Sequence, residues 1–102
     1  MTSLIDQFRP QIQEFCRRYE VARLELFGSA AGDTFDPARS DVDLLVEFLD
    51  TPRMSRADQY FGLLFAMEDL LHRKVDLVSA KEMRNPYFIR SVEATKKLLY
   101  AA

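Results

Sequence analysis

The feature that most constrains this chain is a pair of aspartates at the start of a short apolar run. The run extends from Asp41 to Phe48 and reads DVDLLVEF, a composition typical of a buried β-strand. Residues two apart on a strand point to the same face, so Asp41 and Asp43 are expected side by side. The opposite face is predicted to be apolar, with Val42, Leu44, Val46 and Phe48.

Two carboxylates on one rigid strand repel each other unless a cation lies between them. Mg²⁺ suits such a site, because it is a hard ion that takes carboxylates, waters and substrate phosphates as ligands. Asp76 is a third candidate ligand, since an acidic residue is unusual within the apolar segment 74–78. A hydrogen-bonded structural aspartate is the alternative for Asp76, and the presence of Asp41 and Asp43 earlier in the same short chain favours metal binding.

A phosphate site is predicted just before this strand. Residues 24–27 read as another strand, and Gly28-Ser29 follows at once. Glycine lets the backbone come close to a ligand, and free N–H groups at a helix start near Ser29 would favour an anion. Arg39 is either a further phosphate ligand or a solvated loop charge.

The stretch from Gly28 to Asp43 resembles the signature of the nucleotidyltransferase superfamily, which is Gly-Ser, a spacer and Asp-x-Asp. The resemblance implies a small mixed β-sheet with helices packed mainly on one face, an α/β (α+β) nucleotidyltransferase fold. It also implies a two-metal Mg²⁺ site at Asp41, Asp43 and Asp76, the catalytic residues, with a nucleoside triphosphate bound at Gly28, Ser29 and Arg39. Asp76 matches the family's third carboxylate by context.

The minimal nucleotidyltransferase antitoxins resemble this chain most in size. That resemblance implies transfer of AMP from ATP to a protein hydroxyl (AMPylation), and a helical HEPN ribonuclease toxin as partner. The alternative is a binding module, catalytically weak or inactive, that neutralises a toxin by complex formation. The slightly long spacer and Ala31, where many relatives carry Arg, favour this alternative, whereas the three aspartates argue against it.

Length and charge limit the remaining possibilities. The 102 residues predict one domain over residues 1–102, and a net charge of −2 argues against strong nucleic-acid binding. No apolar run reaches membrane-spanning length. A single cysteine, Cys16, cannot form an internal disulfide, which favours the cytoplasm. The oligomeric state is left open.

Apolar spacing predicts the other elements. A helix is expected up to Tyr19 with a break near Pro10, and another after a cap at Ser55 or Asp58. The second helix is predicted to be mostly buried, with Phe61 and Phe65 widening its apolar stripe and Gly62 marking a close contact. Asn85-Pro86 begins a third helix that places Phe88, Ile89 and Val92 inward. Residues 97–100 are either the last turn of this helix or a short edge strand, and the resemblance to minimal family members favours the strand. Four aromatic residues near element ends are candidates for a partner surface: Phe35, Phe48, Tyr87 and Tyr100.

Overall fold

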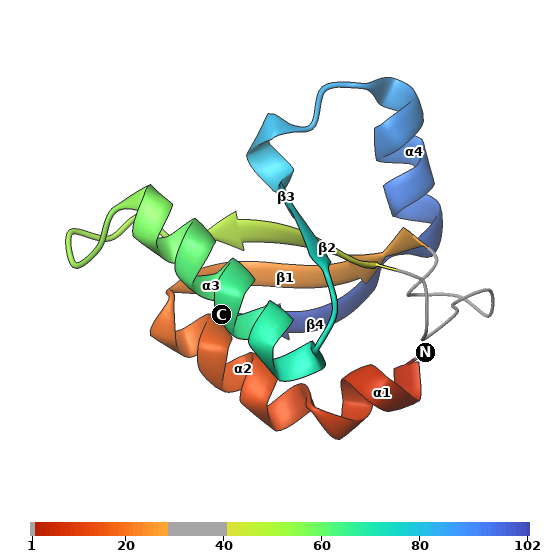
Figure 1. Cartoon of the computed structure of the whole chain (residues 1–102). Helices are drawn as coiled ribbons and strands as arrows, with labels where there is room; N and C mark the ends of the chain where they lie inside the picture. Colours follow the sequence, from red (N-terminus) through yellow and green to blue (C-terminus); the bar gives the residue numbers. More distant parts are fainter. Residues whose placement is uncertain (1, 29–40) are drawn as a thin grey trace.

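The computed structural model describes residues 2–28 and 41–102, which form one mixed sheet and its covering helices (Figure 1). The elements in chain order are α1 (Thr2–Gln7), α2 (Arg9–Arg18), β1 (Val21–Phe27), β2 (Val42–Phe48), α3 (Arg56–Leu71), β3 (Val75–Ser79), η2 (Ala80–Glu82), α4 (Pro86–Thr95) and β4 (Lys97–Ala101). The strand order is β3-β2-β1-β4. Only β2 and β3 run parallel, joined through α3, and the other two pairs are antiparallel. The predicted α/β fold with a small mixed sheet is confirmed.

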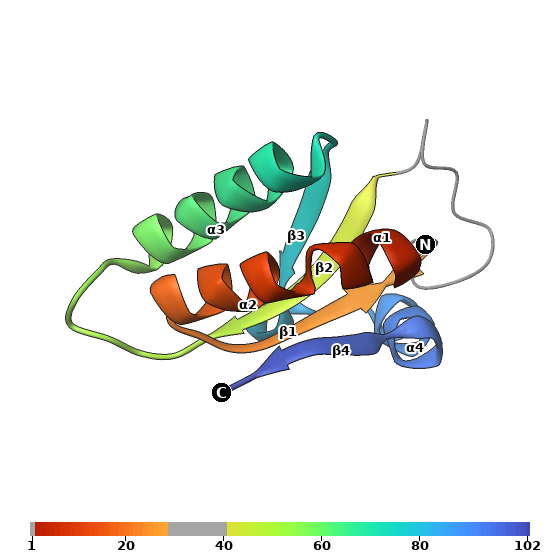
Figure 2. The same ribbon diagram turned by 90° about the horizontal axis from the view of Figure 1, so that it is seen from below.

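The two faces of the sheet are covered unequally. Helices α1, α2 and α3 lie on one face, and α4 lies on the other (Figure 2). The larger core lies on the first face and contains the apolar side of β2: Val42, Leu44, Val46 and Phe48. On the second face, Phe27, Leu45 and Val92 form a smaller cluster. The alternation predicted for β2 is therefore confirmed, and Asp43 lies on the less covered face.

Local sequence signals explain most element ends. Pro10 lies in the first turn of α2, after a break at Phe8. Ser55 caps α3 by accepting a hydrogen bond from the Asp58 N–H at 3.1 Å. Asn85 caps α4 through hydrogen bonds from two backbone N–H groups. The segment after α4 is the predicted strand, β4.

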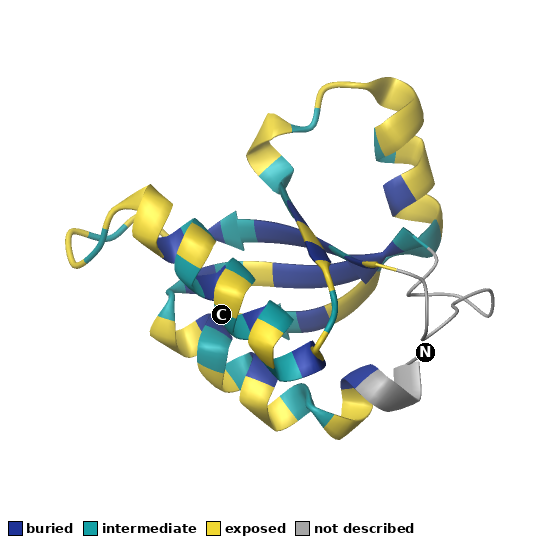
Figure 3. Cartoon of the chain, in the orientation of Figure 1, coloured by how far each residue is buried: buried dark blue, intermediate teal, exposed yellow. Residues whose placement is uncertain are grey.

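The apolar stripe of α3 is narrower than predicted. Its buried residues are Gln59, Leu63, Met67 and Leu71, whereas the side chains of Phe61 and Phe65 are 51% and 62% exposed. A helix that forms an outer layer buries a single stripe, and these two rings lie outside it. On α4, Phe88 is 36% exposed and only Val92 is buried, so the inward set was also too wide. Figure 3 shows α4 as mainly exposed.

The aromatic residues predicted to form a partner surface differ in their exposure. Phe48 is buried, which contradicts its predicted place on a partner surface, while Tyr87 is 78% exposed. Phe35 lies outside the described residues. Cys16 is buried on α2, and its burial raises the pKa of the thiol to about 12, as expected of a small apolar core residue. None of the helices in the described part of the chain is long and apolar enough to cross a membrane.

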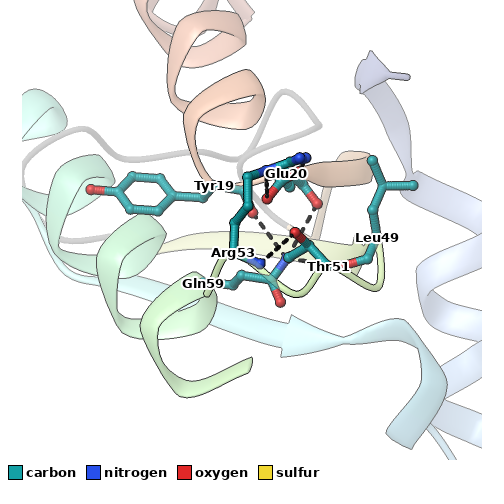
Figure 4. Close-up of polar contacts among 6 residues, drawn as sticks. All are labelled: Tyr19, Glu20, Leu49, Thr51, Arg53 and Gln59. Carbon is teal, nitrogen blue, oxygen red and sulfur yellow. Dashed lines mark hydrogen bonds and ion pairs between the residues drawn. The ribbon is translucent and has the colours of Figure 1, made fainter. Parts of the chain in front are cut away.

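The close contact predicted at Gly62 is confirmed. A Cβ atom there would lie 2.3 Å from Cε1 of Tyr19, so the glycine lets α3 approach the end of α2. One turn earlier, the buried side chain of Gln59 donates to the backbone carbonyls of Tyr19 and Leu49 at 3.2 and 3.0 Å (Figure 4). These contacts join α3 to the end of the sheet where β1 begins and β2 ends.

Candidate active site

The predicted site residues that the structure describes lie at the opposite end of the sheet. Asp43 and Asp76 are each the second residue of their strands, β2 and β3, and they are register partners in the parallel pair. Neighbouring strands are about 4.8 Å apart, and paired residues point to the same face. The parallel β2-α3-β3 connection therefore places two carboxylates side by side, although 33 residues separate them in the chain (76 − 43).

Gly28 lies directly against Asp43. It follows Phe27, which is the register partner of Asp43 on β1. Its φ of +71° lies in the left-handed region, and a Cβ there would approach Oδ2 of Asp43 to 2.5 Å. Both facts require glycine, because any other side chain would be strained and would push the carboxylate away. The glycine predicted to begin a phosphate loop thus adjoins the predicted metal ligands.

A residue that sequence reasoning missed holds Gly28 in place. The N–H of Gly28 donates to Oγ1 of Thr95 at 3.0 Å, and the same hydroxyl donates to the Ser91 carbonyl at 3.1 Å. Thr95 is the last residue of α4. It therefore ties the C-terminal end of that helix to the backbone beside the carboxylates. A threonine at a helix end carries no sequence signal for a contact 67 residues away.

The carboxylates disturb one another electrostatically. Burial raises the pKa of Asp43 above its usual range, and the negative charges of Asp76 and Asp41 raise it further. Asp41 lies just before β2 and is exposed, as is Asp76. Within residues 2–28 and 41–102, no lysine or arginine forms an ion pair with any of the three. The described residues therefore place uncompensated negative charge at this end of the sheet.

These donors have the chemistry of an open site for a hard cation. Among the described residues, no three acidic, histidine or cysteine side chains are gathered closely enough to form a metal site by themselves. The structure brings Asp43 and Asp76 together, and Asp41 contributes its charge from one residue before the strand. Mg²⁺ commonly takes one or two protein carboxylates and completes its shell with water and substrate phosphates. The residues present fit that ion, and Asp41, Asp43 and Asp76 stay the predicted ligands.

The other half of the predicted nucleotide site is not described. Ser29 and Arg39 both lie in residues 29–40, outside the described residues. Their role as phosphate ligands stays a prediction. Gly28, the one predicted nucleotide-binding residue that is described, has its N–H bonded to Thr95, so it does not offer that N–H to a phosphate. Its contribution is the close approach of backbone and carboxylate.

Comparison with known proteins identifies a family. The family model for the nucleotidyltransferase domain matches residues 9–99. Two proteins of Methanocaldococcus jannaschii, both named "Putative protein adenylyltransferase", are 40% identical over 76 residues and 38% identical over 77 residues. Each match covers 74% of this chain and 74% of the relative.

Solved structures share the fold. One described as "putative minimal nucleotidyltransferase" superposes with a TM-score of 0.70 at 30% identity, covering 91% of this chain and 90% of the other. A chain from a toxin-antitoxin structure with AMP-PNP gives 0.68 at 24% identity, covering 92% and 73%. A chain from the complex of tri-AMPylated Shewanella oneidensis HEPN toxin with MNT antitoxin gives 0.64 at 20% identity, covering 95% and 72%.

Proposed function

The chain belongs to the nucleotidyltransferase domain family, and we propose that it transfers AMP from ATP to a hydroxyl group of a partner protein, with Mg²⁺ as cofactor. One observation carries the proposal. Asp43 and Asp76 are register partners on parallel strands, with the backbone of Gly28 directly against Asp43. This arrangement puts two carboxylates without a described counter-ion beside the start of the predicted phosphate loop.

The reaction is an in-line displacement at the α-phosphorus of ATP. The acceptor hydroxyl oxygen forms the new bond to phosphorus, the bond to the oxygen bridging the α- and β-phosphates breaks, and pyrophosphate leaves. Bound metal would stabilise the attacking and leaving oxygens electrostatically. Asp41 and Asp43 would hold the ions, and Asp76 would complete the site and accept the proton of the hydroxyl. Ser29 and Arg39 would hold the triphosphate.

The relatives support a protein acceptor. The two M. jannaschii relatives carry the name of protein adenylyltransferases, and structural neighbours come from toxin-antitoxin structures with AMP-PNP and with an AMPylated HEPN toxin. We therefore propose a HEPN toxin as partner and this chain as its antitoxin. Exposed rings on α3 and α4 are consistent with a partner surface, with Phe61, Phe65 and Tyr87 more than half exposed.

The second candidate function is neutralisation of a toxin by complex formation without catalysis. It is favoured by Ala31, which stands where many family members carry Arg, and by the long spacer. In that case the same partner would bind, but no AMP would be transferred. The two functions therefore differ in one measurable product, the covalently modified toxin.

The test is a transfer assay with ATP labelled at the α-phosphate, Mg²⁺ and a HEPN protein encoded beside this chain. Label on the HEPN protein, abolished by chelator and by Asp43→Asn, is the expected result. Stable complex formation without label would favour the second candidate. If neither a complex nor labelled HEPN protein is observed, the result would contradict a HEPN toxin as the partner. Label that persists undiminished in Asp43→Asn would contradict the assignment of the site.

A further inference from the structure

Among the described strands, the one that carries Asp76 has a neighbour on one side only. The order β3-β2-β1-β4 makes β3 an edge of the sheet. Backbone groups on the open side of an edge strand lack the partners that a further strand would supply, and short edge strands fray easily. An edge strand is a poor support for a carboxylate that must stay beside Asp43. The backbone groups on the open side of β3 therefore need hydrogen-bond partners from outside the sheet.

Two side chains from α3 supply the missing contacts. The N–H of Val75 donates to Oε2 of Glu68 at 3.1 Å, and the hydroxyl of Tyr60 donates to the carbonyl of Leu77 at 2.6 Å. These backbone groups belong to the residues immediately before and after Asp76. In a strand, alternate residues direct their backbone groups to the same side, so both contacts fall on the side away from β2.

The two partners suit this purpose because of their spacing on α3. Tyr60 and Glu68 are eight residues apart (68 − 60), which is just over two helical turns, so both lie toward the same side of the helix. Both are partly exposed, and the side chain of Tyr60 also packs against the larger core. Tyr60 is one of the residues that line an open cavity of about 650 Å³. The Leu77 carbonyl is the hydroxyl's hydrogen-bond acceptor in the described structure.

We infer that Tyr60 and Glu68 are positioning residues for the Asp76 carboxylate. They replace a neighbouring strand at the two peptide groups that flank Asp76, and they fix the pleat that directs its carboxylate toward Asp43. The inference rests on the proposed function in one respect, that Asp76 is a metal ligand. It adds that α3 controls how well the site binds Mg²⁺, although no α3 side chain need touch the ion.

The test compares variants that remove these contacts with little change of shape. Tyr60→Phe deletes only the hydroxyl, and Glu68→Ala deletes the acceptor. Glu68→Gln keeps an acceptor oxygen and serves as the conservative variant. Each protein is assayed for the Mg²⁺ concentration that gives half-maximal transfer, and for the rise in melting temperature on adding Mg²⁺ alone. The second measurement needs neither nucleotide nor toxin, because an ion that binds the folded state raises apparent stability.

Gln59→Leu is the matched control for stability. Gln59 also lies on α3 and also bonds backbone carbonyls, but it does so at the other end of the sheet. This variant should melt at a lower temperature than wild type, because it removes the donor that part-buried backbone carbonyls share. Its half-maximal Mg²⁺ concentration should equal that of wild type. The Gln59→Leu variant therefore separates a loss of stability from a loss of Mg²⁺ affinity.

We expect Tyr60→Phe and Glu68→Ala each to raise the half-maximal Mg²⁺ concentration by about fivefold, the effect of losing roughly one hydrogen bond. The Mg²⁺-induced rise in melting temperature should shrink in both, and Glu68→Gln should behave as wild type. If Glu68→Ala does not fold, Tyr60→Phe decides the matter. Lower melting temperatures with an unchanged Mg²⁺ response in Tyr60→Phe would overturn the inference. A wild-type protein with neither transfer nor Mg²⁺ response would instead overturn the proposed function, and the inference with it.

Discussion

The two ends of the sheet treat polar side chains in opposite ways. At the end where β1 begins, Gln59 is 1% exposed and its amide donates to several backbone carbonyls. Beside it, Glu20 forms an ion pair with Arg53, and the backbone N–H of Arg53 donates to Oγ1 of Thr51 (Figure 4). At the other end, Asp43 and Asp76 lie side by side and no described cation pairs with them. Among the described residues, the polar side chains at the first end have partners, whereas the two carboxylates at the other end have no cationic partner.

The pKa directions express the same contrast. Hydrogen bonds from Arg53 and then Thr51 lower the pKa of Glu20, so folding favours its charged form. Burial, and then the charges of Asp76 and Asp41, raise the pKa of Asp43, so folding disfavours its charged form. A polar cluster with its partners in place stabilises the fold, whereas a cluster of like charges costs stability until a cation binds. This difference separates a structural polar cluster from a candidate binding site.

The largest expected effect comes from removing one charge at the carboxylate end. Asp43→Asn keeps the shape of the side chain and should lower AMP transfer by at least about a hundredfold, since metal ions supply several kcal/mol of transition-state stabilisation. In chelator the variant should melt at the wild-type temperature or above it, because each like-charge pair costs about 1 kcal/mol at 4 Å in water. Added Mg²⁺ should stabilise wild type much more than the variant.

Melting curves with and without Mg²⁺ check this prediction. The control is Glu20→Gln at the other end of the sheet, which should melt below wild type and keep both its Mg²⁺ response and its transfer activity. An Asp43→Asn protein that melts several degrees below wild type in chelator would show that Asp43 is structural. The contrast between the two ends would then be lost.

The next effect compares two glycines that each face a side chain. In Gly28→Ala the new methyl group meets Oδ2 of Asp43 and the backbone has a φ of +71°, so we expect a loss of about 1–2 kcal/mol in stability together with most of the activity. In Gly62→Ala the methyl group meets the ring of Tyr19. Overpacking of about 1–3 kcal/mol outweighs a gain of about 1 kcal/mol in helix propensity, so that variant should lose stability only.

The readout is transfer activity measured well below each variant's melting temperature, alongside the free energy of unfolding. If Gly28→Ala and Gly62→Ala lose equal activity for an equal loss in free energy of unfolding, the contact between Gly28 and Asp43 would have no specific effect on activity. Full activity in Gly28→Ala would remove the close approach of backbone and Asp43 from the account of the site.

Short-range patterns in the sequence predicted the strand residues of the candidate site better than the exposure of the helices. Alternation along residues 41–48 placed Asp43 away from the core, and context identified Asp76, because a strand's two faces follow from local sequence. The exposure of Phe61 and Phe65 was missed, since apolar spacing does not reveal how much of a helix the rest of the molecule covers.

The contacts that support the site were also missed. Thr95 accepts a hydrogen bond from Gly28 across 67 residues, and the Tyr60 hydroxyl donates to the Leu77 carbonyl. Contacts of this kind depend on how α3 and α4 dock on the sheet. No local pattern encodes that docking, so such residues are found only once the tertiary arrangement is known.

A smaller effect is expected from Thr95→Val. The change keeps the size of the side chain but leaves the Gly28 N–H without its acceptor, at a cost of about 1–3 kcal/mol if water does not replace it. Because Gly28 begins the predicted phosphate loop, the KM for ATP should rise severalfold with kcat less affected. Thr95→Ser keeps the hydroxyl and should restore the wild-type KM. An unchanged KM in Thr95→Val would limit Thr95 to a structural role.

The smallest predicted effect is a pH dependence of opposite sign at the two ends, measured without metal. The pKa of Asp43 is raised from 3.8 in the folded chain, so the folded state binds this proton more tightly than the unfolded state. The resulting destabilisation is present at neutral pH and is relieved as pH falls through the raised pKa. The pKa of Glu20 is lowered from 4.5. Its stabilisation is full above 4.5 and is lost as pH falls through the lowered pKa.

Melting temperatures in chelator, taken from neutral pH to about pH 3, below the ordinary values of both carboxyls, test these signs. Any advantage of Asp43→Asn over wild type should shrink as the pH falls, because protonation of wild-type Asp43 removes the same charge. The advantage of wild type over Glu20→Gln should hold down to about 4.5 and then close. A gap between Asp43→Asn and wild type that stays constant over this range would show that neither burial nor the charges of Asp76 and Asp41 disfavour the charged form of Asp43. The acidic end would then need no cation to balance it.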